Sequence, residues 1–440
     1  MNYHIIIKRK IKGALVMDCY INLHADKIPG QWYNILADLP GEIPEERESE
    51  NNPYSKKLMQ KIRIKELLKQ DVSRERMVKI PEEVMEKYLA AGRPVPLMRA
   101  WELERYLGTK ANIYIKREDL LPTHSFKLNS AFAQAYYAKE QGITELVSES
   151  GAGQWGLALS YACKVFGIKC RFFWVKSSMV QKAARADWCR LFGAEITASP
   201  SNITNTGREI LKKDPGCPGS LGISIGEAVE YVSLHKDCAY VSGSNLPHVL
   251  MHQTIIGQEV KAQLKSIGVK PDLFIACCGG GSNLGGFMGP FFFDKEFNQG
   301  TRFLAAESDA APRLVQGEYR YDSADPLGIT PQNISYTLGR DFVPPLNHAG
   351  GLRQHNGSPV IGLLRHKGLL DAEAFSQEEA LKAGKLFSML YGVLPAPESS
   401  HALRAAINKA LDAKKTHKKT EIVLCLSGNG ILDINAYRNI

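Results

Sequence analysis

Short apolar runs alternate with longer amphipathic stretches along most of this chain, starting near residue 94. The apolar runs predict strands at residues 113–116, 145–148, 169–175, 195–198, 239–242, 273–278, 302–307 and 421–426. The stretches between them predict helices at residues 125–140, 154–166, 179–192, 246–266, 377–391 and 401–413. Such alternation is typical of parallel sheets covered by helices on both faces, so we expect an α/β fold.

The part of the chain before this alternation has a different pattern. A polar, acidic stretch at residues 42–53 predicts a loop, and residues 57–69 predict a helix. We interpret the chain as an N-terminal extension that packs on the core, an N-terminal α/β domain and a C-terminal α/β domain. These three regions comprise residues 1–84, 85–250 and 251–440.

Two further segments lack a regular pattern. Residues 310–357 are rich in Gly, Pro, Asn and Tyr, and irregular stretches of this length in an enzyme are usually functional or mobile. The first sixteen residues mix bases with a short apolar run but lack the features of a signal peptide. Met17 is an alternative start of the protein.

Composition narrows the class of protein. The net charge of +9 is compatible with an anionic ligand or a nucleic acid, but the one basic run, residues 414–419, suits a solvated loop. With no nucleic-acid motif and no apolar run of about 18 residues, we expect neither a nucleic-acid partner nor a membrane span. Nine cysteines without metal-ligand spacing suit a reduced, cytoplasmic protein that binds no metal.

Lys127 occupies an unusual position between a predicted strand and a predicted helix. The strand at residues 113–116 leads into a polar turn, and Lys127 falls on the opening turn of the next helix. The helix dipole prefers anions there, so a lysine at this place suggests a specific role. One such role is a covalent bond to the carbonyl of a cofactor whose phosphate the nearby helix amides hold. A solvated surface lysine is the alternative.

A glycine run offers a place for a phosphate. Gly279, Gly280, Gly281, Ser282 and Asn283 follow an apolar strand and precede a helix. Consecutive glycines let backbone amides approach an anion closely, although the spacing matches no nucleotide-binding pattern. Tight packing is the alternative role for such a run. Its place at the carboxyl end of a strand, where open sheets bind ligands, favours binding.

Two other strands end in polar loops. Glu149 begins the loop that continues through Ser150, Gly151, Ala152, Gly153 and Gln154, whose free amides suit a carboxylate. Glu149 is either a solvated acid or a proton acceptor that points into a cleft. Ser427, after the last strand, offers a neutral hydroxyl that can hydrogen-bond a heterocyclic nitrogen without protonating it.

From residue 20 onward the chain resembles the β subunits of tryptophan synthase, and more narrowly their longer second form. These are pyridoxal 5'-phosphate enzymes of fold type II. The resemblance rests on residues 116–119, 127–129, 149–156, 279–283, 348–353, 397–402 and 426–428, in this order. It implies two open, twisted, mostly parallel sheets in two domains with the active site between them. It also implies a cytoplasmic homodimer that acts on L-serine and indole, for which an α subunit is a possible but unnecessary partner.

The resemblance assigns roles to the residues singled out above. Lys127 would hold pyridoxal phosphate covalently and then act as acid and base at the substrate Cα. The cofactor contacts would include Asn129, Gly279, Gly280, Gly281, Ser282, Asn283, Glu398 and Ser427. Ser150, Gly151, Ala152, Gly153 and Gln154 would bind the carboxylate of serine. Glu149 would lie beside the indole nitrogen as the second catalytic residue.

The chain departs from the family at the phosphate end. The family usually has Gly-Ser-His-Lys where this chain has His124, Ser125, Phe126 and Lys127. Phe126 has no side-chain donor for the phosphate, so we expect weaker cofactor binding unless His124 replaces the lost donor. Ser-Phe-Lys is the form of related serine and threonine dehydratases and other β-replacement enzymes, which are the alternative function. A non-catalytic paralogue is a third interpretation.

Overall fold

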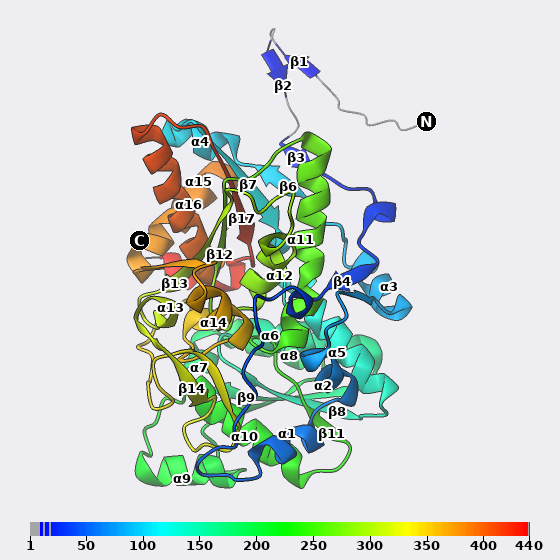
Figure 1. The fold of residues 1–440 in the computed structure, drawn as a ribbon. Helices are drawn as coiled ribbons and strands as arrows, with labels where there is room; N and C mark the ends of the chain where they lie inside the picture. Colours follow the sequence, from blue (N-terminus) through cyan, green and yellow to red (C-terminus); the bar gives the residue numbers. More distant parts are fainter. Residues whose placement is uncertain (1–8, 12–13, 17–18, 439) are drawn as a thin grey trace.

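The computed structural model describes residues 9–11, 14–16, 19–438 and 440, and Met17 lies outside this set. A seven-stranded sheet occupies the upper half of the molecule in Figure 1. Its order is β16 (Asp371–Phe375), β13 (Arg302–Ser308), β12 (Leu273–Cys277), β17 (Thr420–Leu426), β7 (Ala111–Arg117), β6 (Leu97–Arg99) and β3 (Tyr20–Ile21). The first five strands are parallel, and β6 and β3 add to the edge in antiparallel pairs.

A smaller, fully parallel sheet forms the lower half. Its order is β10 (Glu195–Ser199), β9 (Lys169–Val175), β8 (Glu145–Ser150) and β11 (Cys238–Tyr240). The expected strands are all present. The α/β architecture with two mostly parallel sheets is therefore confirmed.

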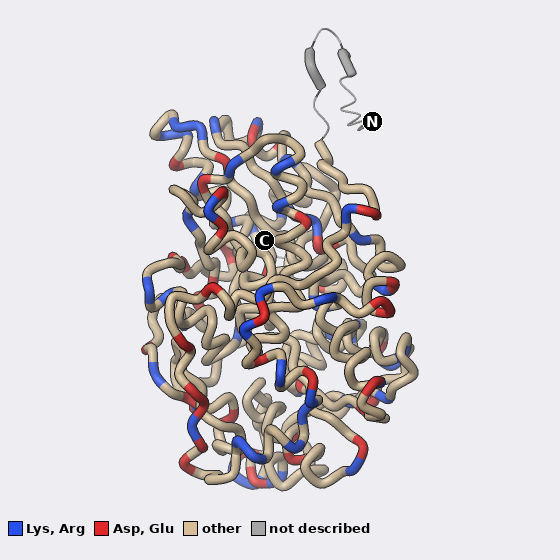
Figure 2. Tube along the Cα trace, turned by 45° about the vertical axis from the view of Figure 1, so that its right-hand side comes forward, with Lys and Arg blue, Asp and Glu red and all other residues tan. Residues whose placement is uncertain are grey.

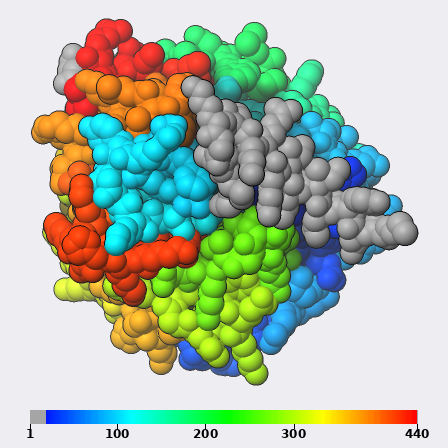
Figure 3. Space-filling view, turned by 90° about the horizontal axis from the view of Figure 1, so that it is seen from above, coloured from blue at the N-terminus to red at the C-terminus, as the bar shows by residue number. Residues whose placement is uncertain are grey.

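Helices cover both faces of each sheet because alternate strand residues are apolar on both sides. On the large sheet, Ile113 and Leu424 pack toward α16 (Pro397–Lys415), whereas Tyr114 and Val423 belong to the core beside α11 (Pro247–Ile267). The other helices near this sheet are α4 (Trp101–Leu107), α12 (Ser282–Phe292), α13 (Arg313–Gln316), α14 (Pro359–His366) and α15 (Gln377–Tyr391). Seen from above, α4 lies against the C-terminal helices α15 and α16, far away in sequence (Figure 3).

The small sheet has the same arrangement. Val147 and Phe173 pack against α10 (Leu221–Leu234), and Leu146 and Phe172 face the opposite layer. The remaining helices around it are α5 (Leu128–Glu140), α6 (Gln154–Phe166), α7 (Lys176–Gln181), α8 (Ala183–Leu191) and α9 (Asn205–Lys213). The helix predicted at residues 179–192 is thus two helices, broken at Lys182.

The N-terminal segment wraps around one side of the core (Figure 1). Its elements are β4 (Gln31–Tyr33), α1 (Ser55–Ile62), α2 (Lys65–Val72), β5 (Met77–Lys79) and α3 (Glu82–Ala90). Both β4 and α2 pack on α11, and Trp32 and Leu67 are buried there. The helix predicted at residues 57–69 is therefore two short helices, α1 and α2.

One segment is more regular than its sequence predicts, and one predicted boundary is not followed by the sheets. Residues 310–357 contain an antiparallel hairpin of β14 (Glu318–Ser323) and β15 (Gln332–Thr337) within otherwise irregular backbone. The division at residue 250 remains a prediction, but sheet order does not follow it. Strand β7 pairs with β17, about 300 residues later, and α11 runs across the boundary.

Positions of acidic and basic residues are interspersed along the trace of the described chain (Figure 2). Within the described residues, no helix is long and apolar enough to cross a membrane. No group of three or more His, Cys, Asp or Glu in the described part of the chain could hold a metal ion.

Candidate active site

Lys127 lies immediately before α5, at the point where the chain leaves the large sheet. Its Nζ donates a hydrogen bond to the Gly243 carbonyl at 2.8 Å and lies 5.1 Å from the centre of the Phe126 ring. No carboxylate of the described chain forms an ion pair with this amine. Burial lowers its pKa to about 8, so a substantial fraction is neutral near physiological pH. A neutral amine is the form that attacks a carbonyl.

The loop between β8 and α6 lines the same cavity as Lys127. Ser150, Gly151, Ala152, Gly153 and Gln154 all contribute to the cavity wall. Among the described residues, the amides of positions 151–154 donate to no protein acceptor, so they remain free for an anion at the N-terminus of α6.

Gly153 allows this loop to turn tightly. It has φ +82°, and a Cβ there would lie 2.1 Å from the Trp174 ring. The residue is therefore restricted to glycine both by its backbone conformation and by the neighbouring indole.

Glu149 lies between two adjoining cavities. It lines the Lys127 cavity and a second cavity that also includes Tyr240, Leu221 and Met59. Its carboxylate accepts hydrogen bonds from Tyr240 at 2.8 Å and Ser242 at 3.3 Å. Burial raises its pKa, which makes the carboxylate a better proton acceptor than a solvated glutamate.

The glycine run forms the start of α12 and adjoins the Lys127 cavity. A Cβ on Gly280 would lie within 3 Å of Ser244 and Gln354, both of which line that cavity. In the described structure the amides of Gly280, Gly281 and Ser282 have no protein acceptor. Free amides at a helix N-terminus are suited to a phosphate.

The side chain of Asn283 completes this end of the site. Its Nδ2 donates to the Cys277 carbonyl at 3.2 Å, whereas its buried Oδ1 has no partner in the described chain. A buried acceptor without a partner is costly, which suggests that a ligand supplies the missing donor.

Ser427 and Glu398 lie on neighbouring elements at the ends of β17 and the start of α16. The Ser427 hydroxyl is buried and lies 2.8 Å from Ser399 Oγ. Glu398 accepts the Gly351 amide at 2.8 Å, and Gly351 lines the Lys127 cavity. Burial raises the pKa of Glu398, and its charge acts on the Lys127 amine.

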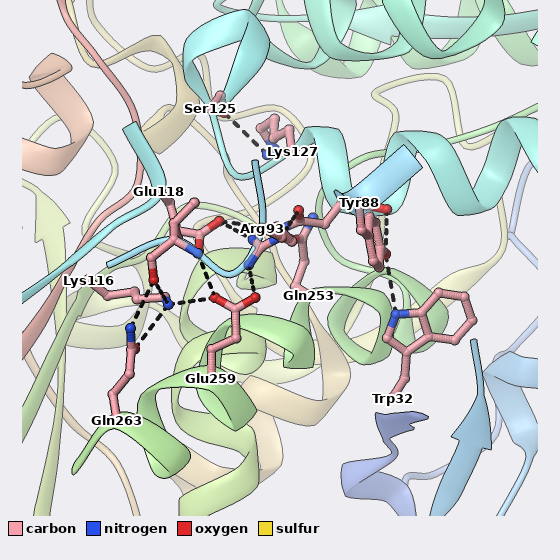
Figure 4. Close-up of polar contacts among 12 residues, drawn as sticks. Trp32, Tyr88, Arg93, Lys116, Glu118, Ser125, Lys127, Gln253, Glu259 and Gln263 are labelled. Atoms are coloured by element: carbon pink, nitrogen blue, oxygen red, sulfur yellow. Dashed lines mark hydrogen bonds and ion pairs between the residues drawn. The ribbon is translucent and has the colours of Figure 1, made fainter. Parts of the chain in front are cut away.

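Asn129 does not point into this cavity. Its Oδ1 accepts Arg93 Nε at 2.9 Å and its Nδ2 donates to Gln253 at 2.9 Å, within the buried polar network of Figure 4. The contact of Asn129 with the cofactor stays a prediction. Its side-chain amide connects α5 to Arg93 and to Gln253 of α11.

The two residues that depart from the family lie in different surroundings. Phe126 is buried in the main core. His124 has φ +58°, a conformation that favours the family's glycine, and its ring packs edge-on against Trp188 with centroids 5.6 Å apart. The structure therefore shows no contact that would make His124 a phosphate donor.

Three polar residues that sequence reasoning missed belong to the site or to its support. Tyr240 binds Glu149, Gln354 lines both cavities, and Arg313 donates to the glycine run. Tyr240 lies in a predicted strand, so knowledge that β11 pairs with β8 would have placed it near Glu149.

The residues present fit a pyridine aldehyde that carries a phosphate. The free amides of the glycine run suit the phosphate, Lys127 supplies a partly neutral amine, and Ser427 supplies a neutral hydroxyl. The unpartnered Asn283 Oδ1 is an acceptor and could bind a donor of the ligand, which a phosphate dianion does not provide. These features agree with pyridoxal phosphate in chemistry.

Comparison with known proteins gives the same result. Residues 88–428 match the family model described as pyridoxal-phosphate dependent enzyme. Tryptophan synthase beta chain 2 of Thermotoga maritima is 49% identical over 96% of this chain and 100% of its own length. The beta chain 2 of Methanothermobacter thermautotrophicus is 47% identical over 95% of this chain and 97% of its own.

Solved structures with lower identity share the fold. A fungal L-serine ammonia-lyase from Rhizomucor miehei has a TM-score of 0.57 and 17% identity, covering 78% of this chain and 97% of that one. Threonine deaminase isoform 2 from Solanum lycopersicum has a TM-score of 0.59 and 17% identity, covering 91% and 93%. The chain belongs to the pyridoxal-phosphate dependent enzymes and, among them, to the family of tryptophan synthase beta chains.

Proposed function

We propose that this chain is a lyase that replaces the hydroxyl of L-serine with indole to give L-tryptophan and water. The observation that carries the proposal is the joint position of Lys127 and Glu149. An amine with a lowered pKa and a buried carboxylate line one cavity, and the carboxylate alone continues into a second cavity. Pyridoxal phosphate, when bound, withdraws electrons from the substrate Cα and so makes loss of its proton and of the β-hydroxyl feasible.

The Lys127 side of the cavity handles serine. The free amides of residues 151–154 hold the substrate carboxylate, which fixes the Cα within reach of the lysine. Lys127, with its pKa near 8, removes the Cα proton and returns a proton at the end of the reaction. Ser427 offers the pyridine nitrogen only a neutral hydroxyl, which favours loss of the leaving group over a long-lived carbanion.

The Glu149 side of the cavity handles indole. The second cavity offers Met59, Leu221, Ile225 and Leu246 to a flat apolar ring. The C3 carbon of indole attacks the β-carbon of the substrate, and positive charge develops on the indole nitrogen. A carboxylate in a buried site stabilises that charge strongly. Tyr240 and Ser242 hold Glu149 in position to accept the proton.

The residues proposed for the cofactor divide into two groups. Gly279, Gly280, Gly281, Ser282 and Asn283 would hold the phosphate end, and Ser427 and Glu398 the ring end. Asn129 is left out, because its amide is bound to Arg93 and Gln253.

A serine or threonine dehydratase is the second candidate. The Ser-Phe-Lys sequence at residues 125–127 favours it, and Phe126 is packed in the core rather than exposed as a vestigial residue. A dehydratase has no need of a carboxylate beside a separate apolar cavity, so the position of Glu149 supports the β-replacement reaction.

The proposal extends to assembly. The chain would act as a cytoplasmic homodimer and would use free indole without an α subunit. The N-terminal segment supports this: Glu46, Met59 and Arg63 line both the indole cavity and an outer cavity beside α1 and α2. We propose that indole reaches Glu149 through these two cavities, which residues of this chain line.

One assay tests the proposal. Purified protein receives pyridoxal phosphate, serine and indole, and both tryptophan and pyruvate are measured. Tryptophan in large excess over pyruvate is expected. Pyruvate as the main product, with indole unused, would favour the dehydratase. Sedimentation and titration with a cognate α subunit test the assembly, and a large stimulation by α would contradict independence.

A further inference from the structure

Arg313 is a buried cation that forms no ion pair with any carboxylate of the described residues. It is 1% exposed and begins the short helix α13 after β13. Its guanidinium donates to the Gly279 carbonyl through Nε at 3.2 Å and again through Nη2, and Nη2 lies 3.4 Å from Cys278 Sγ. Its buried Nη1 has no partner within the described chain. Burial of a charge costs free energy unless the charge is paired and hydrogen-bonded. The buried position of Arg313 therefore indicates a specific role.

The nearby acid Glu307 does not explain that position. Glu307, at the end of β13, accepts the Leu314 amide at 2.9 Å rather than a bond from Arg313. Burial raises the pKa of Glu307 to about 7, despite the opposing effect of Arg313. The direct acceptors of the guanidinium are therefore a backbone oxygen and a sulfur of the segment that leads into the glycine run.

Peptide geometry links Arg313 to the amides of that run. In a trans peptide the C=O and the following N–H point in opposite directions. Arg313 holds the Gly279 carbonyl and the Ser358 amide holds the Gly280 carbonyl, at 2.8 Å. The amides of Gly280 and Gly281 are therefore turned to the opposite side, where neither has a protein acceptor in the described structure.

The loop of residues 150–154, which we propose binds the substrate carboxylate, also has its carbonyls held by side-chain donors. Trp174 Nε1 donates to the Gly151 carbonyl at 3.1 Å, and Arg185 Nη1 donates to the Ala152 carbonyl at 2.6 Å. Arg185 is also paired with Asp433 at 2.8 Å, which compensates its charge. Arg313 differs, because it forms no ion pair with a carboxylate of the described chain, although its charge acts on nearby Glu307.

We infer that Arg313 is a positioning residue for the phosphate of the cofactor. It fixes the Gly279 peptide from behind so that the next amides face the phosphate, and its positive charge favours a dianion at that place. The inference rests on the proposed cofactor site but not on the reaction catalysed there.

The test compares pyridoxal phosphate with pyridoxal, which lacks the phosphate. Arg313→Met keeps an unbranched apolar side chain in place of the arginine stem and removes the charge and the donors. We expect it to weaken pyridoxal phosphate by about 10- to 100-fold, the size of a lost charge-assisted contact, and to leave pyridoxal binding unchanged. Arg313→Lys should recover part of the affinity. Equilibrium titration by absorbance or fluorescence measures both constants without any turnover.

Two further variants keep the test decisive if Arg313→Met folds poorly. A Cβ at Gly357 would lie 2.4 Å from Arg313 Cζ, so Gly357→Ala displaces the guanidinium while keeping its charge in the protein. It should also weaken the phosphate-bearing ligand selectively. Arg365→Met is the matched control, because Arg365 donates to the carbonyls of Leu314 and Leu370 and not to the glycine run.

The inference is overturned by either of two results. Unchanged affinity for pyridoxal phosphate in Arg313→Met and Gly357→Ala would exclude the role. An equal loss for pyridoxal and pyridoxal phosphate would make Arg313 a general structural residue. If only the proposed reaction is wrong, the unmodified protein will bind pyridoxal phosphate more tightly than Arg313→Met does but will form no tryptophan.

Discussion

Two lysines on one short segment, Lys116 and Lys127, have opposite surroundings (Figure 4). Lys116 is fully buried in β7, and its Nζ donates to Glu259 at 2.6 Å, to the Val95 carbonyl at 2.6 Å and to Gln263 at 3.1 Å. All three protons of the ammonium are used. Lys127 makes one bond, to a backbone carbonyl, and has no carboxylate partner in the described chain.

The difference distinguishes Lys116, which stabilises the fold, from Lys127, which is available for catalysis. Around Lys116, Arg93 pairs with Glu118 at 2.5 Å and with Glu259 at 2.8 Å, so two cations face two anions beneath α5. Such a network fixes elements relative to one another. On the elements that adjoin the Lys127 cavity, the amides of residues 151–154 and 280–282 and the Asn283 Oδ1 have no partner in the described chain and can bind a ligand. Unused hydrogen-bonding capacity, rather than charge alone, marks the site.

The largest expected effect follows from removal of Lys127, whose amine makes fewer hydrogen bonds than that of Lys116. Lys127→Met should lower tryptophan formation more than about 1,000-fold, because the residue supplies both the covalent bond and the Cα base. Folding should be retained, as judged by circular dichroism. Full turnover of this variant, measured at saturating serine and indole, would exclude Lys127 from the chemistry.

Glu149 can be tested against the serine half of the reaction. Glu149→Gln keeps the shape of the side chain but cannot take the indole proton, so tryptophan formation should fall about 100-fold or more. Serine deamination to pyruvate, which does not involve indole, should change little. If both activities fall to the same extent, the carboxylate serves the structure of the cavity and not the condensation.

Lys116→Met should affect stability rather than catalysis. Removal of one cation leaves an uncompensated carboxylate in the core, at a cost of about 3 kcal/mol in the free energy of unfolding. Urea denaturation measures the change. The double variant Lys116→Met, Glu259→Gln should recover part of the loss, since it restores neutrality. A single variant as stable as the parent would mean that the network is not energetically coupled.

The pH dependence of the free energy of unfolding tests whether the pKa of Lys127 is lowered in the cofactor-free protein. Its pKa is about 8 in the folded protein and about 10.5 in an unfolded chain, so below pH 8 the native state bears the cost of a buried charge. Between pH 8 and 10.5 the unfolded chain binds a proton that the native chain does not, so stability rises with pH. Relative to cofactor-free Lys127→Met, the parent should gain at most about 3 kcal/mol across this window. A flat difference would show that the lysine titrates normally.

The smallest effect concerns His124. His124→Gly relieves the positive φ but removes the contact with Trp188, and the two changes, each about 1 kcal/mol, should nearly cancel in stability. Cofactor affinity should not change, because the ring packs against α8. Pyridoxal phosphate titration measures it, and a tenfold weaker constant would identify His124 as the substitute phosphate donor.

Much of the fold could be predicted because its strands are apolar on both faces. The parallel strands around Ile113, Phe172 and Ile275 give continuous apolar runs that periodicity detects. Helix α10 was missed because Gly222 and Gly226 resemble helix breakers. In the structure they allow close packing, since a Cβ at Gly222 would lie 2.9 Å from Pro326.

The candidate site divides in the same way. Lys127, Glu149 and the glycine run lie in local strand–turn–helix patterns, so their places could be predicted from sequence. Tyr240 and Arg313 could not, because each acts on a segment 34 or more residues away through sheet pairing or backbone contact. Asn129 was assigned by resemblance, and only its bonds to Arg93 and Gln253 reveal that its amide serves α5.

Reductive trapping tests the central claim most directly. The purified protein is loaded with pyridoxal phosphate, reduced with borohydride and digested, and the peptide that carries the cofactor is identified by mass spectrometry. The account predicts a single modification on Lys127 and none on Lys116, whose ammonium is fully bonded. A modification on Lys116 or on a surface lysine, with Lys127 unmodified, would contradict it.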